Sequence, residues 1–87
     1  MVNTKEVPAV VYVRIRKITT SDSHVEYEFG PNEERVGRIQ IDRVSGEIEV
    51  LADVPDDTNS FYAIRAARKL TLHFRYNEFP DRTCFAS

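Results

Sequence analysis

Four short stretches of the chain alternate between hydrophobic and polar residues with a period of two. They cover residues 9–18, 24–29, 35–42 and 47–51. Because successive side chains of a β-strand point to opposite faces, this period is typical of strands with one buried face. The apolar positions that we expect on the buried face are Val11, Val13, Ile15, Val25, Tyr27, Phe29, Ile39, Ile41, Ile48 and Val50.

A turn signal separates the last two of these stretches. Asp42 ends the first of them and Gly46 directly precedes the second. An aspartate side chain accepts hydrogen bonds from turn backbone, and glycine readily adopts the positive φ that closes a short hairpin loop. We therefore predict an antiparallel hairpin here. Gly37 lies inside the first strand of that hairpin and is a candidate β-bulge.

Residues 61–77 show helical rather than strand spacing. Pro80 follows this stretch as a stop signal, and five candidate N-cap residues precede it: Asp56, Asp57, Thr58, Asn59 and Ser60. On a helical wheel the face expected to contact the sheet contains Ala63, Ile64, Ala67, Leu70, Thr71 and Phe74. The opposite side contains Arg65, Arg68, Leu72 and Arg75.

The simplest assembly of these elements is an α+β fold: a four-stranded antiparallel β-meander with one C-terminal α-helix packed on one face. Residues 81–87 are expected to form a short tail, with Phe85 folding back onto the core. The 87 residues make one domain, 1–87. The other face of the sheet would be open to water, as antiparallel sheets permit.

Composition favours a small cytoplasmic protein. Apolar residues make up 41% of the chain and charged residues 30%, and no apolar run is long enough to cross a membrane. The first residues lack the apolar core of a secretory signal. Cys84 has no second cysteine to pair with, which fits a reducing compartment. We therefore expect a cytoplasmic location and no membrane partner.

Charge is unevenly distributed along the chain. Residues 1–21 carry a net charge of +3, residues 22–57 carry −8, and residues 58–87 carry +3. In a meander, much of the acidic block would lie on the outer sheet face between basic strands, where neighbouring opposite charges pair. The acids left without such a partner are on loops, and they define the first candidate surface, for a basic protein partner: Glu33, Glu34, Asp53 and Asp56.

The exposed side of the helix is the second candidate surface. Basic residues interleaved with an aromatic residue can bind phosphates and stack on bases. The candidate nucleic-acid-binding residues are Tyr62, Arg65, Arg68 and Lys69. The sequence pI near 5.6 makes this alternative less favoured than a protein partner, since nucleic-acid-binding domains are usually basic.

No pattern of residues predicts an enzyme. His24 and His73 have no cysteine or second histidine at metal-ligand spacing, and Cys84 has no neighbouring base to activate it. Phosphate-binding loops and paired-carboxylate motifs are also lacking. We expect no catalytic residues, no metal and no cofactor. A homodimer, formed through edge strands or through Leu72 and Tyr76 of two helices, is a further alternative.

Three segments carry a resemblance to a known group of proteins. They are residues 27–31 (Tyr-Glu-Phe-Gly-Pro), 37–51, and the Ala- and Arg-rich residues 61–70. Together they resemble small bacterial proteins in which a charged β-meander precedes a helix, some of which are immunity proteins of toxins. The resemblance implies an inhibitor that binds a toxin domain through a charged surface and performs no chemistry.

Overall fold

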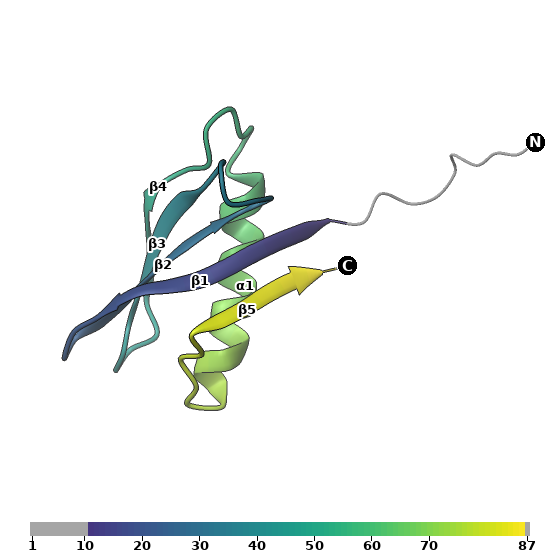
Figure 1. Cartoon of the computed structure of the whole chain (residues 1–87). Coiled ribbons are helices and arrows are strands. Elements are labelled where there is room, and N and C mark those ends of the chain that lie inside the picture. Colours follow the sequence, from purple (N-terminus) through teal and green to yellow (C-terminus); the bar gives the residue numbers. More distant parts are fainter. Residues whose placement is uncertain (1–10, 87) are drawn as a thin grey trace, which may run out of the picture.

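A five-stranded antiparallel sheet with one helix on one face makes up the computed structural model, which describes residues 11–86 (Figure 1). The strand order in the sheet is β4-β3-β2-β1-β5. The elements are β1 (Tyr12–Thr20), β2 (His24–Gly30), β3 (Gly37–Asp42), β4 (Ile48–Ala52), α1 (Phe61–Arg75) and β5 (Arg82–Ala86). The α+β class, the four predicted strands and the helix are confirmed, although residues 9 and 10 of the first predicted strand lie outside the described residues.

The fifth strand corrects the predicted four-stranded meander. Residues expected to form a tail instead pair antiparallel with β1, with Phe85 opposite Val13 and Thr83 opposite Ile15. Without β5, one edge of β1 would expose unpaired backbone N–H and C=O groups. β5 supplies hydrogen-bonding partners for these groups. Phe85 does pack against the core, but as a strand residue.

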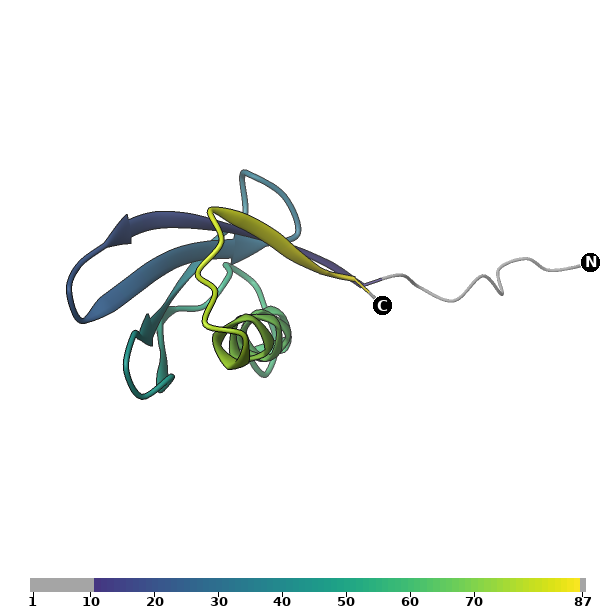
Figure 2. The ribbon, with the colours of Figure 1, turned by 90° about the horizontal axis from the view of Figure 1, so that it is seen from below.

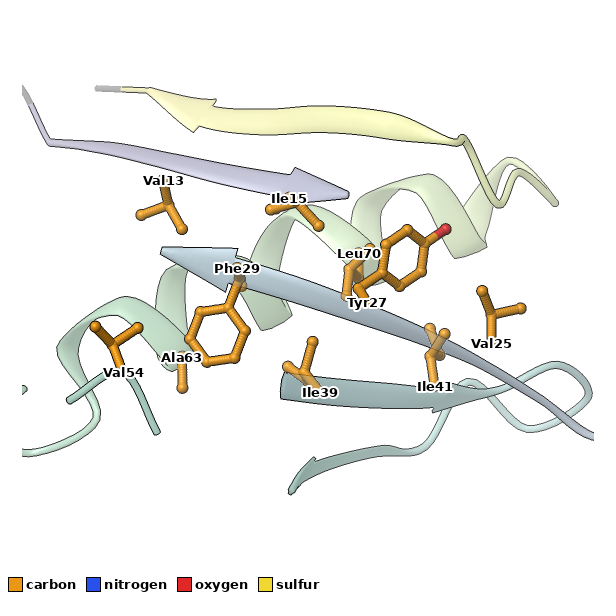
Figure 3. Close-up of a cluster of buried hydrophobic side chains, with 11 residues drawn as sticks. Val13, Ile15, Val25, Tyr27, Phe29, Ile39, Ile41, Val54, Ala63 and Leu70 are labelled. Atoms are coloured by element: carbon orange, nitrogen blue, oxygen red, sulfur yellow. The ribbon is translucent and has the colours of Figure 1, made fainter. Parts of the chain in front are cut away.

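The core lies between the sheet and α1 (Figures 2 and 3). Its buried residues are Val13, Ile15, Val25, Tyr27, Phe29, Ile39, Ile41, Val54, Ala63, Ala66 and Leu70. Val11 and Ile48 are partly buried against it, as predicted. Val50 is 40% exposed, contrary to expectation. It belongs to the edge strand β4, whereas α1 lies over the other four strands.

The buried stripe of α1 is rotated from the predicted one toward Ala66. That alanine is fully buried, whereas Ile64, expected in the core, is 49% exposed. The two small residues Ala63 and Ala66 face the sheet, so the helix can approach it closely. Leu70 lies within this contact, whereas Ile64 is left beside it.

Local hydrogen bonds explain the predicted turn between β3 and β4. The Asp42 carboxylate accepts hydrogen bonds from the backbone N–H groups of Val44 and Ser45, each at 2.8 Å, and Gly46 has a φ of 79°. These bonds favour the ionised carboxylate and lower the pKa of Asp42. The hairpin is therefore confirmed. The register shift of this strand pair falls between Arg38 and Ile39, one residue beyond the predicted bulge at Gly37.

Candidate interaction surfaces

The outer face of the sheet is charged and largely self-paired. Arg16 Nε donates to Glu28 Oε2 at 2.9 Å, and this hydrogen bond raises the pKa of Arg16. Arg38 pairs diagonally with Glu26 on the neighbouring strand. The predicted pairing of charges across strands is thus confirmed for both glutamates of β2. On the two edge strands, by contrast, Arg82 and Glu49 make no ion pair with another residue of the described chain.

The acidic loop residues lie at one end of the sheet. Glu33 and Glu34 are in the loop between β2 and β3, and Asp53 and Asp56 are in the connection from β4 to α1. Because β3 is antiparallel to both of its neighbours, the loop and the connection leave the sheet at the same end (Figure 1). Arg35 Nη2 donates to the Pro55 carbonyl oxygen at 2.8 Å and ties the two segments together.

The four acidic side chains at this end are exposed, and they differ in the contacts that they make. Contrary to expectation, Glu33 has a basic partner on β1: it lies 3.5 Å from the guanidinium group of Arg14, although its side chain is 82% exposed. The Asp53 carboxylate accepts a hydrogen bond from Ser60 Oγ at 3.2 Å. Glu34 and Asp56 are also exposed. We call Glu33, Glu34, Asp53 and Asp56 the acidic end of the molecule.

The neighbouring Asp57 has a structural role. Its Oδ2 atom accepts a hydrogen bond from the backbone N–H of Tyr62 at 3.0 Å, and its Oδ1 atom accepts one from Thr58 N at 2.8 Å. The first of these bonds satisfies a free N–H group at the start of α1. Among the predicted capping residues, Ser60 holds the N-cap position but makes no side-chain capping bond, and Asp57 supplies the carboxylate from three residues earlier.

The basic residues of α1 do not form one uniform surface. The guanidinium carbon of Arg65 lies 3.7 Å from the centre of the Phe61 ring, and its Nη1 atom donates to the Phe61 carbonyl oxygen. Tyr62 is half-buried against the core, so its ring is not a free platform for stacking bases. Arg68 and Lys69 instead line a groove beside the helix.

That groove runs between α1 and β5 and has a volume of about 680 Å³. The sequence does not predict this groove, because one of its walls belongs to β5, a strand that the alternating pattern does not indicate. Its lining residues are Ile64, Ala67, Arg68, Lys69, Thr71, Leu72, Arg75, Phe85 and Ala86. No acidic residue is among them.

The two histidines take part in structural contacts. His73 Nδ1 lies 2.9 Å from Glu78 Oε1, and its Nε2 atom lies 2.9 Å from Thr83 Oγ1, so it joins the end of α1 to β5. His24 Nδ1 lies 2.8 Å from Ser23 Oγ in the turn between β1 and β2. Within residues 11–86, no three potential metal ligands cluster. No helix in this part of the chain is both long and apolar enough to span a membrane.

Comparison with protein-family models, with curated proteins and with solved structures finds no match to this chain. The fold defines the class: an α+β protein with a five-stranded antiparallel sheet and one helix.

Proposed function

We propose that this chain is a small protein-binding module whose acidic end docks onto a basic surface of a partner protein. The observation that carries the proposal is the meeting of two acidic segments at one end of the sheet, tied together by the hydrogen bond between Arg35 and Pro55. Such a module acts by covering its partner and needs no catalytic group. An inhibitor that masks a toxin domain in the cytoplasm is the class of function we favour.

The charge balance of this end supports a basic partner. Five carboxylates, those of the acidic end and Asp57, lie on the two segments, whereas the guanidinium groups near them belong to Arg14 and Arg35. Exposed charges at the rim of an interface chiefly raise the association rate and select the partner. The self-paired outer sheet face and the hydrogen-bonded histidines offer no comparable net charge.

Charge reversal at the acidic end tests this proposal. The partner is captured from the source cell with the wild-type protein, and its binding is then measured by stopped-flow fluorescence and calorimetry. For the double variant Glu33→Lys and Glu34→Lys we expect affinity to fall about tenfold or more, mainly through slower association. Added salt should slow wild-type association in the same way, since it screens exposed charges.

The matched control reverses two acids at the opposite end of the sheet, with Asp22→Lys and Glu47→Lys. These residues lie in the β1–β2 and β3–β4 turns, so the control changes net charge equally without touching the acidic end. It should retain wild-type affinity. Equal affinities for the wild-type protein and the Glu33 and Glu34 double variant would contradict the proposed surface.

A further inference from the structure

β5 is an edge strand with free backbone groups. The backbone N–H of Lys17 donates to the Asp81 carbonyl oxygen at 2.8 Å, just beyond the paired strands β1 and β5. In an antiparallel pair, hydrogen-bonded and non-hydrogen-bonded positions alternate. Thr83 and Phe85 therefore bond to β1, whereas Cys84 directs its N–H and C=O groups away from it. In the described part of the chain, no strand pairs with that outer side.

The groove beside this edge lies on the helix side of the sheet. Phe85, whose side chain packs on that side, forms part of its wall, and α1 supplies Ile64 and Leu72. Ile64 and Leu72 are 49% and 44% exposed, so they offer apolar surface that the core does not use. A strand added to β5 would direct every second side chain into this groove, as in other cases of strand addition.

The charges on both sides of the edge are basic. Arg68 and Arg75 line the groove on the helix side. Arg82 lies on the outer face, opposite Arg16, which is already bound by Glu28. Within residues 11–86, Arg82 makes no ion pair, so its charge is available to a partner, although Glu28 and Glu33 line the same hollow.

From these observations we infer that β5 and the groove bind an extended segment of another protein in which acidic and apolar residues alternate. Its apolar side chains would fill the groove beside Leu72, and its acidic side chains would face Arg82. A second copy of this chain, paired through β5, would bring no acidic side chain of its own strand to this edge, since β5 contains Arg82 and no carboxylate. Glu33 of the acidic end lines the same hollow as Arg82, but the inference does not depend on the function proposed for that end.

A synthetic peptide tests the inference with the whole protein. The probe is fluorescein-labelled Glu-Val-Glu-Val-Glu-Val-Glu, and the controls are a peptide with the same residues in two blocks and one with lysine in place of glutamate. We expect fluorescence anisotropy to show binding of the alternating acidic peptide, weakened by salt, and at least tenfold weaker binding of both controls. Equal binding of the three peptides, or no binding of the first, would overturn the inference.

Amide NMR shows where the peptide binds. We expect shift changes along β5 and slower hydrogen exchange at the Cys84 amide, which gains a partner. Exchange at the Phe85 amide, already bonded to β1, should change little. Shift changes confined to other strands would overturn the inference.

Two matched substitutions separate the groove from general surface effects. Leu72→Glu places a charge in the groove, whereas Leu51→Glu places one on β4. The exposed fractions of the two side chains are similar, 44% for Leu72 and 42% for Leu51. Neither residue belongs to the buried core, so we expect both variants to fold, and circular dichroism checks this. Peptide affinity should fall about tenfold or more for Leu72→Glu and stay unchanged for Leu51→Glu. Equal affinities for the two variants would count against the groove.

Two experimental results would assign the groove to an occupant other than the inferred peptide segment. If light scattering shows a dimer that Leu72→Glu converts to a monomer, a second copy fills the groove and the inference is wrong. If an RNA or DNA oligonucleotide competes with the peptide and binds more tightly at the same salt concentration, the groove serves nucleic acid instead.

Discussion

The hydroxyl group of Tyr27 donates a hydrogen bond to the backbone carbonyl oxygen of Pro80, 2.9 Å away and 53 positions later in the chain. Tyr27 is buried in β2 at the centre of the sheet (Figure 3). Pro80 lies in the connection from α1 to β5. The bond holds this connection against the core just before the chain enters β5. It thereby helps to set the position of the strand that borders the groove.

Removing the Tyr27 hydroxyl should destabilise the protein without changing the fold. In Tyr27→Phe the ring still fills the core, but the Pro80 carbonyl loses its buried donor. We expect a loss of about 1 kcal/mol in the free energy of unfolding, measured by urea denaturation. The surface residue Tyr76, 70% exposed, supplies a control, since Tyr76→Phe should change stability little. Equal effects of the two substitutions would contradict a role for this bond.

The same hydroxyl should make the protein sensitive to alkaline pH. Burial, with a smaller effect of Asp81, raises the pKa of Tyr27 from 10.0 to about 12. The folded state therefore retains a proton that the unfolded state releases, and this contribution to stability is complete below pH 10. It is lost at about 1.4 kcal/mol per pH unit as the pH rises toward 12. Urea denaturation of the wild-type protein and Tyr27→Phe across this range should show stabilities that converge with rising pH and then cross.

Asp42 should make the β3–β4 hairpin sensitive to acid. Backbone N–H groups of Ser45 and Val44 lower the pKa of this carboxyl below its ordinary value of 3.8. Its contribution to stability is complete above that value and is lost as the pH falls through the lower pKa of the folded state. In Asp42→Asn, the melting temperature should fall less steeply over this acidic range than in the wild-type protein. Parallel curves would show that Asp42 does not supply the dependence.

The Arg38–Glu26 pair should contribute a small coupling energy to the sheet. The two side chains are diagonal neighbours on adjacent strands, and the arginine side chain is 57% exposed. A double-mutant cycle with Arg38→Ala and Glu26→Ala should give a coupling of about 0.2–1 kcal/mol. The coupling should shrink at high salt, because exposed charges are screened. A coupling that salt leaves unchanged would indicate packing rather than charge.

Gly30 should not tolerate a side chain. A Cβ atom at this position would overlap the backbone carbonyl oxygen of Arg35, which cannot move aside as a flexible side chain could. We expect Gly30→Ala to lower the free energy of unfolding by about 1–3 kcal/mol, as overpacked positions do. A change within about 0.5 kcal/mol in urea denaturation, the range of ordinary surface substitutions, would show that the β2–β3 loop is free to shift.

Patterns within short segments predict most of this fold, whereas the groove depends on contacts between distant segments. The four alternating stretches and the Asp42–Gly46 turn carry their own signals, so these elements could be predicted. β5 could not, because its five residues hold a single large apolar side chain, Phe85, and follow closely after Pro80. Its strand conformation depends on the open edge of β1.

The rotation of the helix stripe has a similar cause. Ala66 and Ile64 are both apolar, and the shape of the sheet decides which of them faces it. The exposure of Ile64 and the presence of β5 together create the groove. More of the acidic end than of the groove could be predicted from the sequence. Its acidic residues are evident there, and the meander places their two segments at one end of the sheet.

The pairing of β1 with β5 also has a consequence for the order of synthesis. β1 is translated before β2, β3 and β4, but its second neighbour, β5, is the last of the described strands to be made. At a typical ~5–20 residues per second, the intervening chain takes about 3–12 s to make. During that time the growing chain exposes one side of β1, and the sheet can close there only after Ala86 has been added.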